Sequence, residues 1–392
     1  MSSGRRLTVW GLVLGLVVAG YLGRSQVGDA FDATTDAISG WTTKLRDVAA
    51  AEPKSEVAQR SLEGVSSSVL VVLGSGEGDA AFALLASDPA GPPTLIVLPQ
   101  DLLLPVPGFG EFRLVDALVF GGPELAALAV TNEFGIRLDG VAELPAGSVS
   151  DGLPGPVVVD LSVPLFVEEP DGTVARILAA GATEVTPDFV EVLLTTAGTG
   201  DAFEWIQRQG SAWRTVLGAV AESPGVADRI TSLGGSDAPD AADLLVTVAA
   251  DSDALLATVP VGRAQSSTGV EALIPAGQQA DDFVINRLNH LLLRPGGRPR
   301  IEILNGNGRI GTTADISGIL VRDGFRIVRT DNADDFDYED TLVVAQGDDA
   351  EAWAREIVEL LGRGLLFLEV RAPSGVVDIS IIVGHDIPSG EG

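Results

Sequence analysis

The sequence predicts an α/β domain followed by a small α+β domain, both carried on one N-terminal transmembrane helix. Three observations predict this architecture. An uncharged apolar run lies near the N-terminus, runs of β-branched residues alternate with helical patterns in the middle, and a Pro- and Gly-rich segment precedes a shorter βαββαβ pattern. The 392 residues, 46% of them hydrophobic, suit two domains of about 100–200 residues plus an anchor.

The composition excludes several classes of protein. The formal net charge is −30, and an acidic chain repels phosphate backbones, so we expect no nucleic-acid partner. The chain has no cysteine, which excludes disulfides, thiolate nucleophiles and zinc–thiolate sites. Lys44 and Lys54 are the only lysines beside many arginines. With abundant Ala, Gly, Val and Asp, this bias suggests a high-GC bacterial genome.

Residues 7–23 are the predicted membrane anchor. The run LTVWGLVLGLVVAGYLG follows Arg5 and Arg6 and is long enough to cross a bilayer. The positive-inside rule keeps residues 1–6 in the cytoplasm and places the bulk of the chain outside. A cleaved signal peptide is the alternative, but VVAGYLGRS lacks a clear small-residue cleavage site, so we favour the anchor. Both interpretations make the rest of the chain extracytoplasmic, and the first predicts a single-pass cell-membrane protein.

Residues 24–62 are predicted to form a stalk. One apolar stripe with near-heptad spacing runs along it and comprises Phe31, Ile38, Trp41, Leu45 and Val48. The stripe fits a short dimerising helix or a juxtamembrane helix that packs on its own domain. It is too short to specify a coiled coil, so we favour the second interpretation.

Residues 63–277 are the predicted α/β domain. Apolar runs predict buried strands at 68–74, 82–86, 94–98 and 157–161. Helical patterns cover residues 115–129, 186–196 and 201–221. Strands that alternate with helices indicate a sheet that is covered on both faces.

Five segments of this domain follow one another in a recognisable order. They are LVVLGSG before Asp79, LIVLPQD at 95–101, PVPGFGEFRLVDALVFGG at 105–122, FGIRLDGV at 134–141 and DAFEWIQRQ at 201–209. In this order they resemble the LytR–CpsA–Psr family of envelope phosphotransferases. The family transfers glycopolymers from a polyprenyl-pyrophosphate carrier to the cell wall. The resemblance therefore implies a cell-envelope protein whose partners are a glycopolymer, a polyprenyl-linked carrier or other envelope proteins.

The family's chemistry needs arginines on the pyrophosphate and carboxylates on Mg²⁺, because a planar guanidinium grips phosphate and Mg²⁺ prefers carboxylate oxygen. The resemblance carries these roles onto a few residues of this chain. Asp79 and Asp101 are the candidate Mg²⁺ ligands. The candidates for the pyrophosphate are Arg113 and Arg208, with Gln209 beside them.

Other positions depart from the family pattern. Gln100 replaces the arginine of Pro-Arg-Asp, and Ala80 replaces the threonine of Asp-Thr. EVLLTTAG at 191–198 has no arginine, and an expected helix arginine falls on Glu204 or Trp205. Loss of phosphate-binding cations is the change that this chemistry tolerates least. The leading prediction is therefore a non-catalytic, degenerate domain with no cofactor.

The alternative function is a divergent phosphotransferase that uses Mg²⁺ to attach glycopolymers to peptidoglycan. The two functions predict different geometries. An active site requires one cleft that gathers Asp79, Asp101, Arg113, Arg208 and Gln209, whereas a degenerate domain leaves them scattered. Transcriptional regulation, suggested by the family's historical attenuator label, is disfavoured because the chain has no DNA-binding motif.

Residues 278–299 are a predicted linker that ends in RPGGRP, and residues 300–387 are the C-terminal domain. Predicted strands lie at 301–304, 325–329, 341–345 and 379–383. One predicted helix is capped by Thr312 or Thr313 and runs to Arg322, and another covers 350–361. This order suggests a ferredoxin-like sheet. The segments ILNGNG, DGFRIV and IIVGHD resemble the LytR C-terminal domain, which commonly follows the phosphotransferase domain.

The turn NGNG at 305–308 precedes a helix and allows two interpretations. It is either a phosphate cradle or a tight turn, and the lack of GxGxxG or Walker spacing favours the turn. His290 and His385 are the only histidines. Neither has the neighbours that a catalytic triad or a metal site requires, so we expect no site at either.

Overall fold

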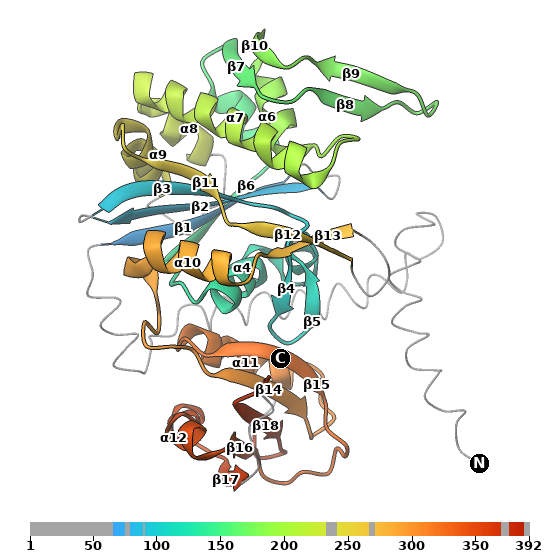
Figure 1. Cartoon of the computed structure of the whole chain (residues 1–392), viewed down its shortest axis with the longest axis vertical. Coiled ribbons are helices and arrows are strands. Elements are labelled where there is room, and N and C mark those ends of the chain that lie inside the picture. The colour runs from blue at the N-terminus through green and yellow to red at the C-terminus, as the bar shows by residue number, and fades with distance from the viewer. Residues whose placement is uncertain are drawn as a thin grey trace.

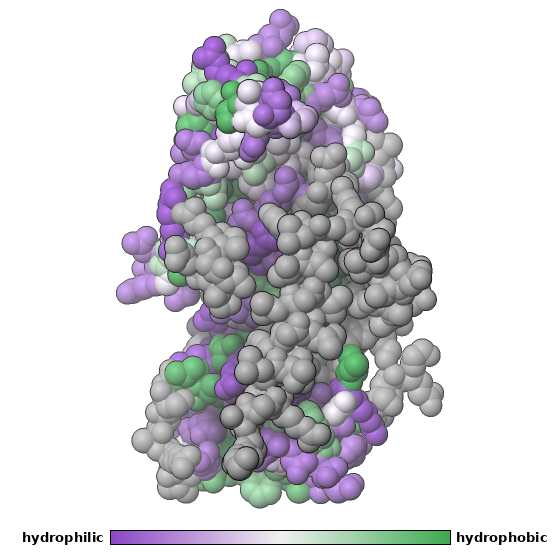
Figure 2. All heavy atoms as spheres, turned by 90° about the vertical axis from the view of Figure 1, so that its right-hand side faces the viewer, coloured by the Kyte–Doolittle hydropathy of each residue, from purple (hydrophilic) through white to green (hydrophobic). Residues whose placement is uncertain are grey.

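A computed structural model gives the fold of the chain (Figure 1). It describes residues 66–74, 79–88, 91–232, 241–265, 271–369 and 376–387. The predicted anchor and stalk lie outside the described residues, so they stay predictions. The face seen in Figure 2 carries hydrophilic side chains over both domains, as expected for a chain with a net charge of −30.

The central sheet has five strands in the order β11-β3-β2-β1-β6. They are β1 (Ser67–Gly74), β2 (Ala80–Asp88), β3 (Gly91–Leu98), β6 (Gly140–Leu144) and β11 (Leu255–Thr258). β2 is antiparallel to β1 and β3, whereas the outer strands β6 and β11 run parallel to their neighbours. The predicted strands at 68–74, 82–86 and 94–98 are confirmed.

Side chains of the central sheet alternate between two cores, as a pleated strand requires. On β1, Leu70 and Val72 face one core, whereas Val69 and Val71 face the other. Figure 1 shows α4 and α10 on the first face and the remaining large helices on the second. The helices are α4 (Leu114–Phe134), α5 (Ser148–Gly152), α6 (Pro187–Thr195), α7 (Ala202–Glu222), α8 (Gly225–Ser232), α9 (Ala241–Ala250) and α10 (Gln278–Arg287).

Among the described residues, four two-stranded ribbons surround the central sheet. They pair β4 (Leu103–Val106) with β5 (Gly110–Arg113), β7 (Val157–Leu161) with β10 (Gly181–Val185), β8 (Leu165–Glu168) with β9 (Val174–Leu178), and β12 (Val261–Gln265) with β13 (Glu271–Pro275). The ribbon of β8 and β9 projects from the end that carries α7 (Figure 1). Only β7 among these strands was predicted, because the others are short and mostly half-exposed.

Helix α4 lies between the central sheet and the C-terminal domain. It is apolar and long enough to cross a membrane, but 61% of its most apolar stretch is buried inside the protein. It is therefore a core helix. It kinks at Gly121 and Gly122, where Gly122 has a φ of 73°, a left-handed conformation that favours glycine. Pro123 follows the kink and cannot donate to the preceding turn.

The C-terminal sheet has five strands in the order β15-β14-β18-β16-β17. They are β14 (Arg300–Asn305), β15 (Arg326–Asn332), β16 (Leu342–Gln346), β17 (Leu365–Glu369) and β18 (Ile379–Val383). α11 (Thr312–Arg322) connects the parallel pair β14 and β15, and α12 (Glu351–Leu361) connects the parallel pair β16 and β17. β18 lies between the two pairs, antiparallel to β16.

The ferredoxin-like prediction is therefore wrong. In the split βαβ arrangement another strand separates the two parallel strands that a helix connects, whereas here both parallel pairs are direct neighbours. The prediction also missed β17. Its sequence LLFLE has apolar residues on both faces, so no alternating pattern marks it as a strand.

The predicted linker over residues 278–299 contains regular structure. Residues Gln278–Arg287 form α10, and a 3₁₀ turn follows at Asn289–Leu291. Arg294 then binds the C-terminal domain, since its Nη2 lies 2.7 Å from Asp323 Oδ2 and 2.6 Å from Glu356 Oε1. The segment is thus fixed to the domain that follows it.

Asn132 connects the two domains through its side chain. It is fully buried on α4, and its Nδ2 donates to the carbonyls of Pro105 at 3.0 Å and Ile327 at 2.9 Å. Its Oδ1 accepts from the Ile327 N–H at 2.8 Å. The amide therefore acts as a strand partner for β15 and ties this strand to both α4 and β4.

We predict that Asn132→Ala lowers the free energy of unfolding by about 1–3 kcal/mol, because buried backbone groups of Ile327 lose their partner. Urea denaturation followed by tryptophan fluorescence measures the change. Asn286→Ala, an exposed site on α10, is the matched control and should change the free energy by less than about 0.5 kcal/mol. Equal effects of the two variants would contradict the role assigned to Asn132.

Candidate functional site

Asp79, Gln100 and Asp101 meet at one edge of the central sheet. Asp79 precedes β2, and the other two follow β3, which is antiparallel to β2. The start of one strand therefore lies beside the end of the other. Gln100 Nε2 donates to Asp79 Oδ1 at 2.9 Å, and Gln100 Oε1 accepts from the Ala80 N–H at 2.8 Å. Gln100 thus holds the two strand ends together.

Arg113 reaches this edge from the end of β5, where it is also the N-cap residue of α4. Its Nη1 lies 3.2 Å from Asp101 Oδ1. Its Nε and Nη2 donate to the two carboxylate oxygens of Asp116 at 3.0 and 2.8 Å. A bidentate pair of this kind uses the same planar fork that grips a phosphate group. Asp116 therefore occupies the part of Arg113 that a pyrophosphate would need.

Arg113 pairs with two carboxylates, those of Asp101 and Asp116, and the carboxylate of Asp79 acts on Asp101. Burial raises the pKa of Asp101, Arg113 lowers it, and the charges of Asp79 and Asp116 raise it again. Hydrogen bonding to Asp116 raises the pKa of Arg113. The carboxylates outnumber the guanidinium, so the cluster disfavours an approaching pyrophosphate.

The residues present fit Mg²⁺ poorly. One oxygen each of Asp79 and Asp101 already accepts a hydrogen bond, from Gln100 and Arg113 respectively. The guanidinium of Arg113 also repels a cation at this place. In the part of the chain that the structure describes, no group of three or more histidine, cysteine, aspartate or glutamate side chains is arranged around a common metal position.

Arg208 and Gln209 lie apart from this cluster, buried on α7. Arg208 is 1% exposed, and its guanidinium donates to the backbone carbonyls of Pro164, at 3.2 Å, and Ala197. Gln209 Nε2 donates to the Leu194 carbonyl at 2.7 Å. These bonds hold α7 against the loops that flank α6 and β8. Of the five predicted residues, the structure brings together the two aspartates and Arg113.

The electrostatic surroundings of Arg208 agree with this separation. Burial lowers the pKa of Arg208, and the charges that oppose this shift belong to Glu204 and Asp201. Both acids lie on the first turn of α7 or at its start. Within the described residues, the charges that act on Arg208 are therefore those at the start of its own helix.

The sequence reasoning missed two charged residues near the edge. Asp116 follows Arg113 by three residues at a helix start, a capping-box spacing that marks such a contact. Arg263 lies opposite Leu273 in the ribbon of β12 and β13, and the Leu273 N–H donates to the Asp101 carbonyl at 3.1 Å. No motif marks Arg263.

Arg263 is held near the start of α7. Its Nη2 lies 2.5 Å from Asp201 Oδ2, and its guanidinium carbon lies 5.1 Å from the centre of the Phe203 ring. Because Asp201 also accepts from the Glu204 N–H as the helix N-cap, this ion pair joins the ribbon to α7. The second cation near the edge is thus paired as well.

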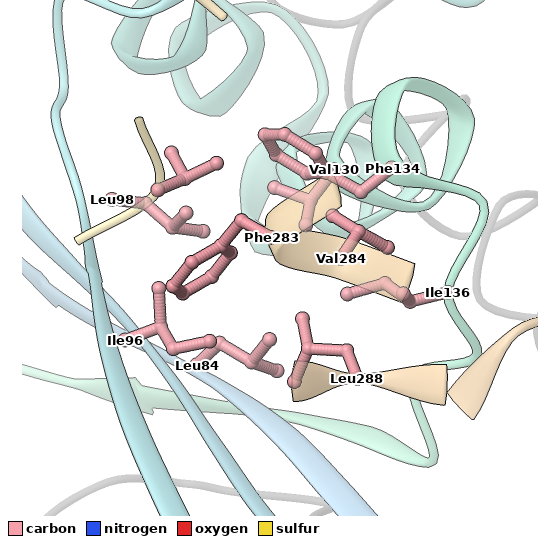
Figure 3. Close-up of a pocket in the computed structure, with 10 residues that line it drawn as sticks. Leu84, Ile96, Leu98, Val130, Phe134, Ile136, Phe283, Val284 and Leu288 are labelled. Carbon is pink, nitrogen blue, oxygen red and sulfur yellow. The ribbon is translucent and has the colours of Figure 1, made fainter. Parts of the chain in front are cut away.

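An apolar hollow lies between the central sheet and helices α4 and α10 (Figure 3). Its enclosed volume is about 10 Å³, room for roughly one water molecule and far below the roughly 300–1,000 Å³ of pockets that hold small molecules. Figure 3 shows the Phe283 ring reaching from α10 toward Leu84 and Ile96. The lining residues are Leu84, Ile96, Leu98, Val130, Phe134, Ile136, Val259, Phe283, Val284 and Leu288.

The NGNG segment is a tight turn that its own asparagines organise. Asn305 Oδ1 accepts from the N–H groups of Asn307 and Gly308, and Asn307 Nδ2 donates to the Gly384 carbonyl. The predicted cap at Thr312 or Thr313 is wrong. Gly311 is the N-cap of α11. Its φ of 91° is a left-handed conformation that favours glycine over threonine.

Each of the two histidines has one polar contact through a ring nitrogen. His290 Nδ1 lies 3.6 Å from Asp88 Oδ2, and burial lowers its pKa. His385 Nε2 lies 3.1 Å from the Phe336 carbonyl. Neither ring belongs to a catalytic triad among the described residues.

Residues 298–386 match a family model described as "LytR cell envelope-related transcriptional attenuator". These residues are a LytR C-terminal domain. The chain is also 33% identical over 101 residues to a "Probable cell wall biosynthesis protein LcpB" from Corynebacterium glutamicum. That alignment covers 24% of this chain and 24% of the relative, so the chain matches about a quarter of the relative's length. These two similarities confirm the predicted relationship to the LytR–CpsA–Psr family.

Solved structures similar to this chain include B. subtilis TagV. The two share 13% identity and a TM-score of 0.46, and the match covers 58% of this chain and 97% of TagV. A LytR-Csp2A-Psr enzyme from Actinomyces oris has 18% identity and a TM-score of 0.46, covering 62% and 93%. TagT bound to LI-WTA has 17% identity and a TM-score of 0.45, covering 59% and 92%. At these values no function passes from those proteins to this chain.

We predict that Arg208→Ala lowers the free energy of unfolding by about 2–3 kcal/mol, because buried carbonyls lose charged hydrogen-bond donors. Arg214→Ala is the matched control, since Arg214 is exposed on the same helix and should change the free energy by less than about 0.5 kcal/mol. Guanidinium denaturation measures both values. An Arg208→Ala variant as stable as the control would contradict the structural role of these hydrogen bonds.

Proposed function

We propose that this chain is a membrane-anchored accessory protein of the cell envelope whose LytR–CpsA–Psr-like domain binds its ligand without transferring it. The observation that carries the proposal is the bidentate pairing of Arg113 with Asp116 at 2.8 and 3.0 Å. A phosphotransferase needs its arginine fork on the phosphate oxygens. Here the fork is closed by a carboxylate of the same chain.

The rest of the edge supports the proposal. Gln100, which replaces an arginine, uses both ends of its amide within the protein. Arg208 is buried against backbone carbonyls. Phosphoryl transfer depends on positioning and on electrostatic stabilisation of the transferred group. The groups that would supply both have internal partners instead.

The ligand that we infer is a polyprenyl-linked carrier held by its tail, a ligand class that the family relationship implies. The hollow between the central sheet and helices α4 and α10 is lined by apolar side chains alone, which suits a hydrocarbon and no charged group. Because its enclosed volume is only about 10 Å³, side chains such as Phe283 have to move before a tail can enter. A glycopolymer or a partner envelope enzyme is the other ligand class that the family relationship implies.

A divergent phosphotransferase is the second candidate function. Asp79, Asp101 and Arg113 do lie at one edge of the sheet, and this observation favours it. For activity, Asp116 would have to release Arg113 when the pyrophosphate binds. In this exchange the pyrophosphate takes the place of the Asp116 carboxylate on Arg113. Because both anions bind a guanidinium through two hydrogen bonds, the bonds lost and gained are of similar strength.

The deciding experiment titrates the ectodomain from residue 63 with a short-chain polyprenyl pyrophosphate, with and without Mg²⁺, and follows binding and phosphate release together. We expect binding without turnover. Mg²⁺-dependent turnover that Asp79→Ala abolishes, and that Asp282→Ala on the exposed face of α10 does not, would establish the phosphotransferase instead. Absence of binding would refute the carrier as ligand and direct the search to protein partners.

We predict that Phe283→Ala tightens binding of the polyprenyl tail by about threefold to tenfold. The ring fills part of the hollow (Figure 3), so removing it widens the space for the hydrocarbon. Ile285→Ala is the matched control, because Ile285 lies on the same helix and is 54% exposed. Fluorescence titration measures the dissociation constants. Weaker binding by the Phe283 variant, with unchanged binding by the control, would place the tail elsewhere.

A further inference from the structure

The carboxylate of Asp116 accepts three hydrogen bonds from one residue, Arg113. The backbone N–H of Arg113 donates to Oδ2 at 3.1 Å, its Nε donates to the same oxygen at 3.0 Å, and its Nη2 donates to Oδ1 at 2.8 Å. Arg113 thus forms a small anion cradle. The anion that fills it is a side chain three residues further along the chain.

The place of this cradle favours anions in general. Arg113 is the N-cap residue of α4, a helix of 21 residues, and a helix N-terminus carries a partial positive charge. A guanidinium binds a carboxylate or a phosphate through the same kind of paired N–H groups. The Asp116 carboxylate therefore stands where two oxygens of a phosphate group would bind.

Asp101 fixes the opposite side of the guanidinium. Its Oδ1 lies 3.2 Å from Nη1 of Arg113, and this nitrogen takes no part in the bonds to Asp116. Asp101 is therefore a positioning residue. We expect it to keep the Nε and Nη2 groups turned toward the cradle when the Asp116 carboxylate is removed.

The backbone at the start of α4 is also fixed without Asp116. The Leu114 N–H donates to the Leu102 carbonyl at 2.9 Å, and the Val115 N–H donates to the Gln100 carbonyl at 3.1 Å. The side chain of Asp116 is 24% exposed, so a ligand can reach the carboxylate from solvent. A change confined to this carboxylate therefore opens the cradle and leaves its frame in place.

We propose that Asp116 is an autoinhibitory residue, which competes with the phosphate of a lipid-linked ligand for the Nε and Nη2 groups of Arg113. The inference rests on the proposed function, since it concerns the same ligand. A carboxylate tethered so close to the arginine competes at a high effective concentration. Free phosphates therefore bind weakly, whereas a phosphate that is also held by its hydrocarbon tail has the same advantage and displaces the carboxylate. The contact selects lipid-linked phosphates over free ones.

The test measures binding of inorganic pyrophosphate to the full-length chain in detergent, by isothermal titration calorimetry with EDTA present. We expect Asp116→Ala to bind pyrophosphate at least about tenfold more tightly than the wild type, because Nε and Nη2 of Arg113 are then open. Glu111→Gln is the matched control. It removes one negative charge from an exposed position on the same face of β5 and should change the affinity by less than about twofold.

Two further variants assign the gain to the fork. Arg113→Gln added to Asp116→Ala should abolish the gain, because no guanidinium remains. Asp116→Asn removes the charge and keeps an acceptor for the Arg113 backbone N–H, so it replaces Asp116→Ala if circular dichroism shows that the alanine variant is unfolded. In NMR spectra of arginine Nε–H groups, pyrophosphate should shift the Arg113 signal of the Asp116 variant at concentrations that leave the wild-type signal unchanged.

Equal pyrophosphate affinities of the wild type and a folded Asp116 variant would overturn the inference. The proposed function would then still stand, because binding of the polyprenyl tail is measured separately. A gain that persists without Arg113, or that Glu111→Gln reproduces, would also overturn it, since net charge alone would explain the change. If the wild type binds no polyprenyl pyrophosphate while Asp116→Ala shows the expected gain, the proposed carrier fails and the autoinhibitory contact remains.

Discussion

The guanidinium of Arg298 is the constraint on which the arrangement of the two domains depends. It donates to the carbonyls of Asn132 and Glu133 on α4, and to those of Gly324 and Phe325 in the C-terminal domain. Burial lowers its pKa to about 10, which shows how strongly this position disfavours a charge. Four carbonyl dipoles from two domains offset that cost, and they do so only in one relative placement of the domains.

This junction links the C-terminal domain to the candidate site. The buried core continues from the central domain through α4 into the C-terminal sheet, and Asn132 binds both β4 and β15. The opposite end of α4 begins beside Arg113 and Asp116. The C-terminal domain therefore packs on the helix whose first turn carries Asp116, the carboxylate that binds the Arg113 guanidinium. Among the described residues, this domain contacts the helix that carries the site and not the site itself. The asparagines of its NGNG turn bond to backbone groups within the same domain.

The sequence predicted those parts of the structure whose physical cause is local. Buried strands such as Ser67–Gly74 are visible as apolar runs, since both faces of the strand are covered. The mixed order of the C-terminal sheet was not visible, because strand pairing is decided by long-range packing. The same limit applies to the site. The sequence shows Arg208 on a helix, but its burial against the Pro164 and Ala197 carbonyls depends on loops distant in the chain.

The polar groups at the sheet edge find their partners within the chain. Buried polar groups are nearly always paired, and this requirement decides which side chains suit the edge. Gln100 is a neutral group that meets this requirement from both ends, with Asp79 and the Ala80 N–H. An arginine there has no acceptor for the Ala80 N–H. A glutamine at position 100 therefore joins the ends of β2 and β3 with both ends of one neutral amide, which an arginine there could not do.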